Sequence, residues 1–589
     1  MIRTRIGRFL TNGGAIALLA LVVYVLLAPA HVVDGDNAEL AGVGAIGGRA
    51  HPPGFPAYVM YLRATSWIPA SSPAHTAAIS TAILAAMLIY VLHAACRAWG
   101  ARPFAATVAV ALYGGSPVVL RMHTEAEVFA MNALVVAGIL WLAAAEGPLR
   151  GAWRVAVLGL VAGVGLGNHT TCVLLAPIGL LGAVRGLRET ATPVRAAAGG
   201  IASLALGLST YLYLIIADGP ISFGRVESFG DIVAFFTRAD YGGPTAFLPG
   251  AGTVLPLDNL AAFAATLGRA YLWLPILLGL IVLGLRTWRA GTGEPRWGWA
   301  LLALTFIVAG PALAMRFNIP PTGLGLYVCQ RFHLLALLLL AIPVAVGFDR
   351  VGDWLARRTS SVRRPSAAFG TGLGCVAFLA LVASALPWLR TKHSPAMELG
   401  IRNMLQSLPE KAIVLVDSED LCFGADYVQY AAHVREDVDV ACWIVTSRDW
   451  YRARLASRGV PITGAFTEEI GGGQMLAMLA TGRPVFVDRS QHGAIARLPS
   501  YPFGTLIRIL APGEHPPPLQ EVVALNRRIY ESFDLAYPRP GADDDYAAIA
   551  HKRYRATWLI LAGALEKAGD ATGAAEAIEI AAQLAPEVE

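Results

Sequence analysis

About eleven apolar segments with few charges recur along the first two thirds of this chain, and each approaches the length that crosses a bilayer. The chain is 56% hydrophobic and only 15% charged, which is too apolar for an ordinary soluble protein. We therefore predict an α-helical polytopic membrane protein with about eleven transmembrane helices in residues 1–389. The segments lie at 13–31, 74–95, 104–120, 127–145, 154–167, 170–184, 197–216, 259–285, 298–314, 333–348 and 369–388.

Arginine is concentrated in every second loop between these segments, beginning with the N-terminal MIRTRIGR. Because cytoplasmic loops carry the excess of Arg and Lys, this pattern predicts a cytoplasmic N-terminus and an extracytoplasmic C-terminal tail. The first segment also resembles a signal sequence, with Ala28-Pro29-Ala30 as a cleavage-like site. Either interpretation places the loop after it outside the cytosol. We expect an integral protein of a bacterial inner (plasma) membrane.

The C-terminal tail, from about residue 390, has the pattern of a soluble domain. Residues 390–540 predict a soluble α/β domain with a small parallel sheet, whose strands fall at 412–416, 438–445 and 484–488. Cys422 and Cys442 lie in this domain and would be able to pair outside the cytosol.

Residues 541–589 resemble a tetratricopeptide helix pair, with Gly569 in the turn. The members of its predicted apolar face are Trp558, Leu561, Leu565, Ala574, Ile578, Ala581 and Pro586. A single repeat cannot bury its own face, so it must pack on the preceding domain or on a protein partner. The alternative is an ordinary amphipathic hairpin that closes the soluble domain.

Polar and ionisable residues gather at the predicted outer ends of the apolar segments. Such groups are costly at a membrane face and usually mark a site. A second long outer loop contains ESFGDIVAFFTRADYGG, which predicts a short interfacial helix around residues 232–236. The outer residues are Asp34, Asp36, Glu39, Arg49, His51, His123, Glu125, Glu127, Asn168, His169, Arg238, Asp240, Tyr241, Arg316, Arg331 and His333.

This residue set suits glycosyl transfer from a lipid-phosphate donor. The lipid needs a membrane groove, the phosphate needs partners such as Arg, and the acceptor hydroxyl needs a carboxylate to take its proton. The chain has no phosphate-binding glycine loop of the nucleotide-binding type, and its GVGLG run at 163–167 is better explained by tight helix packing. No basic cluster with interleaved aromatics indicates a nucleic-acid partner, and no Cys/His spacing indicates zinc.

Two short segments resemble a known family. The chain has Asp36-Asn37-Ala38-Glu39, and then Ala50-His51-Pro52-Pro53-Gly54-Phe55-Pro56, whose three prolines fix the backbone. Further similar segments are Glu127 to Leu134, Gly165 to His169, Tyr241-Gly242 and, more loosely, Tyr427 to Gln429 and Arg435 to Val438. Together they resemble the polytopic GT-C glycosyltransferase family, formerly a domain of unknown function, whose animal member is a protein O-mannosyltransferase of the endoplasmic reticulum.

The resemblance implies inverting transfer of a hexose, mannose in the family, from a polyprenyl-phosphate donor to a protein Ser/Thr or other extracytoplasmic hydroxyl. It implies that Asp36 is the general base, Glu39 orients it or binds acceptor, and His51 positions the sugar or phosphate. Asp34 falls outside the D-x-x-E pattern and is interpreted as a bystander. Arg331, or alternatively Arg238, is expected to stabilise the phosphate, with the pocket completed by Arg49, Glu127, Asn168, His169 and Tyr241. The chain departs from the family at Gln330, where a Glu is expected.

Alternatives remain open. One alternative is a glycosyltransferase of the same fold whose acceptor is a lipid or polysaccharide, and a divalent cation would be able to bridge the carboxylates and the phosphate. A transporter or flippase would also have many spans, although internal repeats and charges near the midplane are not seen. A non-catalytic membrane scaffold would work through the C-terminal helical hairpin and its protein partner.

Overall fold

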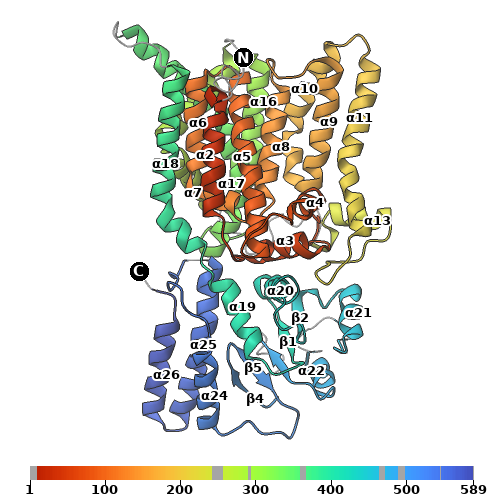
Figure 1. The fold of residues 1–589 in the computed structure, drawn as a ribbon, viewed down its shortest axis with the longest axis vertical. Coiled ribbons are helices and arrows are strands. Elements are labelled where there is room, and N and C mark those ends of the chain that lie inside the picture. The colour runs from red at the N-terminus through yellow and green to blue at the C-terminus, as the bar shows by residue number, and fades with distance from the viewer. Residues whose placement is uncertain are drawn as a thin grey trace.

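A helical bundle forms one end of the molecule, and an α/β domain with a helical hairpin forms the other (Figure 1). The computed structural model describes residues 10–241, 256–289, 294–358, 366–462, 464, 471–488, 498–543 and 545–587. The helices of the bundle are α2 (Ala15–Leu27), α5 (Pro73–Ala98), α6 (Pro103–Gly115), α7 (Pro117–Thr124), α8 (Phe129–Ala143), α9 (Gly151–Asn168), α10 (Ala176–Arg188), α11 (Pro193–Leu208), α12 (Tyr213–Ile216), α14 (Pro256–Tyr271), α15 (Leu274–Trp288), α16 (Arg296–Ile307), α17 (Gly323–Arg358) and α18 (Ala367–Lys392).

The number of spans is smaller than the sequence predicts. Within the described residues, six helices are long and apolar enough to cross a membrane, or up to eight if α6–α7 and α14–α15 each count as one bent span. The other three predicted segments fall on shorter apolar helices, Asn12–Leu27, Phe129–Ala143 and Arg296–Ala312. At a rise of about 1.5 Å per residue, helices of this length are shorter than a hydrocarbon core of about 30 Å. The prediction of about eleven spans is therefore wrong by this criterion, although the helical polytopic class is confirmed.

Close helix packing accounts for the glycines of α9. A Cβ atom added at Gly163 would lie 2.3 Å from the carbonyl oxygen of Leu204, and one at Gly159 would lie 2.3 Å from that of Gly200. Both carbonyls belong to α11, so only glycine lets the two backbones approach this closely. The predicted packing role of the GVGLG run is confirmed.

Two short helices, α3 (Gly35–Ile46) and α4 (Pro56–Thr65), lie between the bundle and the α/β domain (Figure 1). The Asp34 carboxylate begins α3 as its N-cap, because it accepts a hydrogen bond of 2.7 Å from the backbone N–H of Asn37. A helix, α13 (Phe229–Phe236), forms in the loop where the sequence predicts an interfacial one, and a Ser228–Asp231 capping box begins it. Ile232 and Phe235 are its buried apolar residues.

The soluble domain contains a mixed sheet. Its strands follow the order β2-β1-β3-β5-β4, and β1 runs parallel to both β2 and β3, as predicted. The sequence did not predict the two further strands that make the sheet mixed: β4 and β5 form an antiparallel hairpin around Gly504, and β5 adds antiparallel to β3. The elements are α19 (Ala396–Ser407), β1 (Ile413–Val416), α20 (Glu419–Asp426), β2 (Asp439–Cys442), α21 (Asp449–Ser457), α22 (Gly471–Leu479), β3 (Val485–Val487), β4 (Ser500–Phe503), β5 (Leu506–Ile509) and α24 (Leu519–Glu531).

The C-terminal hairpin consists of α25 (Asp545–Lys567) and α26 (Ala571–Leu584). Trp558, Leu561 and the other buried residues of the pair share one apolar cluster with Val522 and Val523 of α24. The hairpin therefore packs on the preceding domain, which was one of the two predicted possibilities. Ile578 does not belong to this face, because 54% of it is exposed, and Ala577 is buried instead.

A disulfide between Cys422 and Cys442 joins α20 to β2 and confirms that the two cysteines pair. The other cysteines, Cys96, Cys172, Cys329 and Cys375, are free. The bond thus fixes α20, the helix of the soluble domain that packs against α3, to the sheet.

We expect the double substitution Cys422→Ser/Cys442→Ser to lower the free energy of unfolding of the soluble domain by about 3 kcal/mol, because the bond closes a loop between residues 20 positions apart. Chemical denaturation of the full chain in detergent measures this change. Reducing agent should lower the wild-type value by a similar amount and leave the double variant unchanged. Cys375→Ser, which removes a free thiol, is the matched control. Equal stability with and without reductant would contradict the prediction.

Candidate active site

One buried guanidinium, that of Arg331 on α17, contacts three carboxylates. Its terminal nitrogens lie 2.5 Å from Asp36 Oδ2, 3.3 Å from Asp34 Oδ2 and 3.4 Å from Glu127 Oε1. Asp34 and Glu127 are almost wholly buried, whereas a quarter of the Asp36 side chain is exposed. The structure thus brings together three sequence-predicted site residues, Asp36, Glu127 and Arg331, from α3, the loop before α8, and α17.

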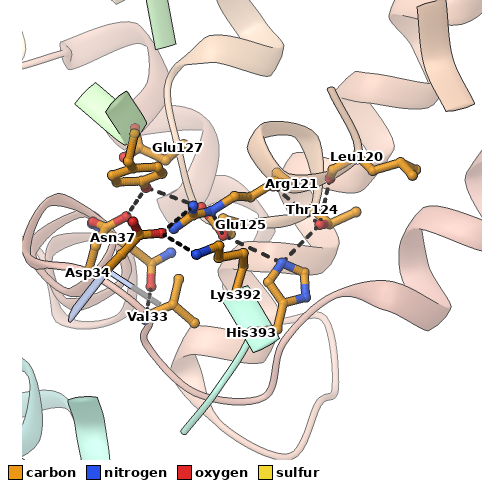
Figure 2. Close-up of polar contacts among 12 residues, drawn as sticks. Val33, Asp34, Asn37, Leu120, Arg121, Thr124, Glu125, Glu127, Lys392 and His393 are labelled. Atoms are coloured by element: carbon orange, nitrogen blue, oxygen red, sulfur yellow. Dashed lines mark hydrogen bonds and ion pairs between the residues drawn. The ribbon is translucent and has the colours of Figure 1, made fainter. Parts of the chain in front are cut away.

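Asp34 is an integral part of this cluster. The Tyr327 hydroxyl donates a hydrogen bond to Asp34 and lies 3.3 Å from Glu125 Oε2. Arg121 in turn donates to Glu125 over 3.0 Å (Figure 2). The interpretation of Asp34 as a bystander is therefore wrong. The D-x-x-E pattern could not reveal its role, because that role depends on capping α3 and on contacts with a helix almost 300 residues away.

Glu39 and His51 form a second buried pair. His51 Nδ1 lies 2.6 Å from Glu39 Oε2, and the backbone N–H of His51 donates to Glu39 Oε1 over 2.8 Å. The twelve-residue spacing in the sequence therefore corresponds to a direct, two-point contact. Asp36 and Glu39 are three residues apart on one helix, which places both on the same face. The rings of Phe55 and Phe423 lie 5.2 and 5.8 Å from that of His51.

Asn168 and His169 lie beside this cluster, where α9 ends. The amide of Asn168 donates to the carbonyl of Val128 over 3.1 Å, next to Glu127, and its buried Oδ1 makes no hydrogen bond within the described residues. The His169 ring lies 5.4 Å from the Phe129 ring and 6.2 Å from the Phe55 ring. These aromatic contacts connect His169 to His51 through Phe55.

The remaining predicted site residues are Arg49, Arg238 and Tyr241. Arg49 donates to the backbone carbonyls of Ala217, Phe223 and Gly224, so it holds a neighbouring loop and contacts none of the carboxylates of the cluster. Arg238 follows α13 and is close enough for its charge to lower the pKa of Asp36. Tyr241 ends a described segment, and its side chain and Gly242 lie outside the described residues.

The soluble domain supplies site residues that the sequence did not indicate. The N-terminal end of α20 lies against that of α3, since a Cβ added at Gly35 would be 3.1 Å from the backbone of Glu419. Burial, and then the charge of Asp36, raise the pKa of Glu419. Burial also raises the pKa of Tyr546 on α25, and the charge of Asp34 raises it further. Helical periodicity shows only that such residues are polar; their approach to α3 depends on how the domains pack.

The three acids around Arg331 differ in their pKa. Burial acts to raise the pKa of Asp36, but Arg331 and His51 together hold it below its ordinary value. Burial raises the pKa of Glu127 well above its ordinary value despite the same Arg331, and burial also raises the pKa of Asp34. One cation cannot compensate three buried negative charges. Of the three acids, Asp36 is therefore the one whose ionised form is favoured, and burial favours the protonated form of Glu127.

A metal site is not formed within the described residues, where no three His, Cys, Asp or Glu side chains are grouped to hold an ion. The carboxylates of Asp34, Asp36 and Glu127, which have the chemistry to bind a divalent cation, contact Arg331 instead. A bridging divalent cation stays a prediction from the sequence.

Comparison with known proteins identifies the N-terminal part of the bundle. Residues 36–190 match the family model described as "Protein O-mannosyl-transferase TMEM260 N-terminal domain". This stretch contains Asp36, Glu39, His51 and Glu127. Over these residues the chain is similar to the TMEM260 family.

Two individual proteins are similar to it. "Protein O-mannosyl-transferase tmem260" from Dictyostelium discoideum is 19% identical over 473 residues, which are 73% of this chain and 57% of that protein. The chain thus spans a little over half the length of this TMEM260 relative. The crystal structure of ArnT from Cupriavidus metallidurans in the apo state is 13% identical, with a TM-score of 0.46 over 88% of this chain and 100% of ArnT, which is too low to assign the fold.

We expect the Glu39–His51 pair to make the protein less stable as the pH becomes alkaline. Burial acts to lower the pKa of His51, but Glu39 outweighs it and raises the pKa from 6.5 to about 9. Because the pKa of His51 is higher in the folded state, the pair stabilises the fold fully at pH values below the unfolded pKa of 6.5. This stabilisation is lost as the pH rises through about 9. The thermal midpoint of the wild type should therefore fall across this range, and its advantage over His51→Gln should shrink. The exposed His433→Gln is the control. An advantage that is constant with pH would contradict the assignment.

Proposed function

We propose that the chain is a membrane glycosyltransferase of the GT-C type that transfers a hexose, mannose by similarity to that family, from a polyprenyl-phosphate donor to an extracytoplasmic hydroxyl. The acceptor class that the same similarity supports is a protein Ser or Thr. The observation that carries the proposal is the partly exposed Asp36 carboxylate, which contacts Arg331 beside two buried acids at the junction of bundle and soluble domain, in a chain whose residues 36–190 match the TMEM260 N-terminal domain.

Asp36 acts as the general base in this proposal. Its carboxylate takes the proton of the acceptor hydroxyl while the hydroxyl oxygen attacks the anomeric carbon of the donor. The bond from that carbon to the phosphate oxygen breaks, and the phosphate leaves with the electron pair. Attack opposite to the leaving group inverts the anomeric centre. Arg331 holds Asp36 in place, and burial raises the pKa of Glu127, which lies on the other side of the same guanidinium.

The leaving phosphate needs cationic partners. Arg331, the first of the two expected partners, already contacts three acids, and we therefore favour the other, Arg238, together with the protonated ring of His51. Both cations act electrostatically on Asp36, so both lie near the proposed point of attack. Asn168, whose Oδ1 makes no described hydrogen bond, is proposed to bind a sugar hydroxyl.

The lipid tail of the donor is proposed to approach Arg331 from the side of the bundle. A narrow cleft lined by Phe129, Leu335 and Leu338, with the polar Asn132 and Thr171 at its wall, reaches Arg331 between α8 and α17. The cleft has a volume of only about 10 Å³, so α8 and α17 would have to separate for a polyprenyl chain to lie between its apolar walls.

The soluble domain is proposed to face the acceptor, because Glu419 and Tyr546 close the site from its side. The arginine pattern and the position of α3 beside this domain support an extracytoplasmic site in a bacterial inner membrane with a cytoplasmic N-terminus. Residues 1–389, 390–540 and 541–589 are proposed as the transmembrane, α/β and hairpin units.

Asp36→Asn should lower transfer at least about 100-fold, because the base is lost while the side chain keeps its shape. The assay follows labelled mannose from polyprenyl-phosphate mannose to a Ser/Thr peptide in membranes that contain the full chain. Asp258→Asn, an exposed carboxylate at the start of α14, should retain wild-type activity.

Undiminished transfer by Asp36→Asn would overturn the base assignment. Product on a glycan or lipid but not on the peptide would favour a polysaccharide or lipid glycosyltransferase. Lipid-linked sugar that crosses liposomes without any product would indicate a flippase, and the absence of both would indicate a scaffold.

A further inference from the structure

A second polar pocket lies beside the carboxylate cluster, where the bundle meets α25. It has a volume of about 390 Å³ and is bounded by α7, α14, α17 and α18. Tyr327 separates the two sites: the guanidinium carbon of Arg121, in the pocket wall, lies 3.8 Å from the Tyr327 ring centre, and that of Arg331 lies 4.4 Å from it. Neither Asp36 nor Glu127 lines this pocket.

Three cations line the pocket, and the C-terminal part of the chain neutralises two of them. Arg121 lies 2.7 Å from Asp545, and Lys392 lies 3.4 Å from the same carboxylate and donates to the backbone carbonyl of Asp543 over 2.8 Å. Figure 2 shows the charged ends of Arg121 and Lys392 converging from two different elements. Their side chains are only 3% and 9% exposed.

Arg269 on α14 is the third cation of the wall. It is exposed, and it makes no ion pair or hydrogen bond with the residues that the structure describes. The neutral Gln330 lies in the same wall. Among the described side chains of the pocket wall, three cations face the two carboxylates of Asp543 and Asp545, so these side chains carry a net positive charge and the Arg269 guanidinium has no carboxylate partner among them.

The surroundings of the pocket are suited to a lipid. Val118, Leu326 and Trp388 supply its apolar wall. The bend that follows Arg269 exposes Leu272, Trp273 and Leu274, each more than half exposed. Tryptophan is enriched at membrane interfaces, and basic pockets between transmembrane helices bind lipid headgroups. A cationic pocket next to an exposed apolar bend therefore matches a ligand with an anionic head and an apolar tail.

We propose that this pocket binds the phosphate headgroup of a membrane lipid. Arg269 supplies the cation that no described carboxylate occupies, Lys392 contacts the phosphate from the opposite side, and the tail lies along the bend at Leu272–Leu274. Since Lys392 and Arg121 also hold Asp545, a bound phosphate shares the cations that attach α25 to the bundle. Lipid occupancy thus strengthens or weakens the contact between the C-terminal hairpin and the membrane domain.

Native mass spectrometry of the purified full-length protein in detergent tests the proposal. The probes are the anionic lipids phosphatidylglycerol and polyprenyl phosphate, the lipid phosphatidylcholine, which has no net charge, and inorganic phosphate. Arg269→Gln should reduce binding of an anionic lipid about threefold to tenfold, as expected for one charge-assisted contact at a partly exposed site. Arg316→Gln, an exposed arginine outside the pocket, is the matched control and should bind as the wild type does.

The relative affinities of phosphatidylglycerol and polyprenyl phosphate identify which lipid is the source of the headgroup. Equal binding by Arg269→Gln and Arg316→Gln would overturn the proposal, as would binding of inorganic phosphate without binding of either anionic lipid. The inference does not rest on catalysis. Asp36→Asn should retain lipid binding, so a failed transfer reaction and a failed lipid site give different results.

Discussion

The structure depends on one cation, Arg331, which holds three acids that lie far apart in the sequence. Asp34 and Asp36 begin α3, Glu127 precedes α8, and Arg331 lies almost 300 residues later on α17. Removing one member of a buried, hydrogen-bonded charge group typically costs about 3–5 kcal/mol, because the remaining charges lose their compensation. Arg331 therefore fixes where α3 lies, and α3 in turn carries both Asp36 and the Glu39 that binds His51.

The same cluster connects the membrane bundle to the soluble domain. Tyr327 and Glu125 extend it from Asp34 to Arg121, and Arg121 reaches Asp545 at the start of α25. On the other side of α3, α20 brings Glu419 and Phe423 to the site, and the Cys422–Cys442 disulfide fixes α20 to the sheet. The site is thus built between two parts of the chain.

Local patterns in the sequence were sufficient for part of this account. Asp36, Glu39 and His51 were found because helical spacing and a rigid proline segment bring them together within 16 residues. The apolar segments identified the polytopic class, but hydropathy alone did not show that three of them form short helices. The β4–β5 hairpin was missed although Gly504-Thr505 separates two four-residue strands, since both strands are short and β4 contains a proline.

The features that the sequence could not predict depend on contacts between residues that lie far apart in the chain. Asp34 and Asp36 are both acidic residues near the start of one helix, and only the contacts with Tyr327 and Arg331 distinguish their environments. Arg49 looked like a binding residue because it lies between Glu39 and His51, yet backbone carbonyls of a distant loop engage it. Glu419 and Tyr546 carry no local signal, because their proximity to α3 arises from domain packing.

The different protonation of the acids around Arg331 is the property that a measurement tests most directly. Infrared spectroscopy of the protein in lipid nanodiscs at neutral pH resolves the carbonyl band of protonated carboxyl groups. We expect Glu127→Gln to remove intensity from this band and Asp36→Asn to leave it unchanged, because burial raises the pKa of Glu127 whereas Arg331 and His51 hold that of Asp36 below its ordinary value. Loss of the band in Asp36→Asn together with its persistence in Glu127→Gln would contradict the account.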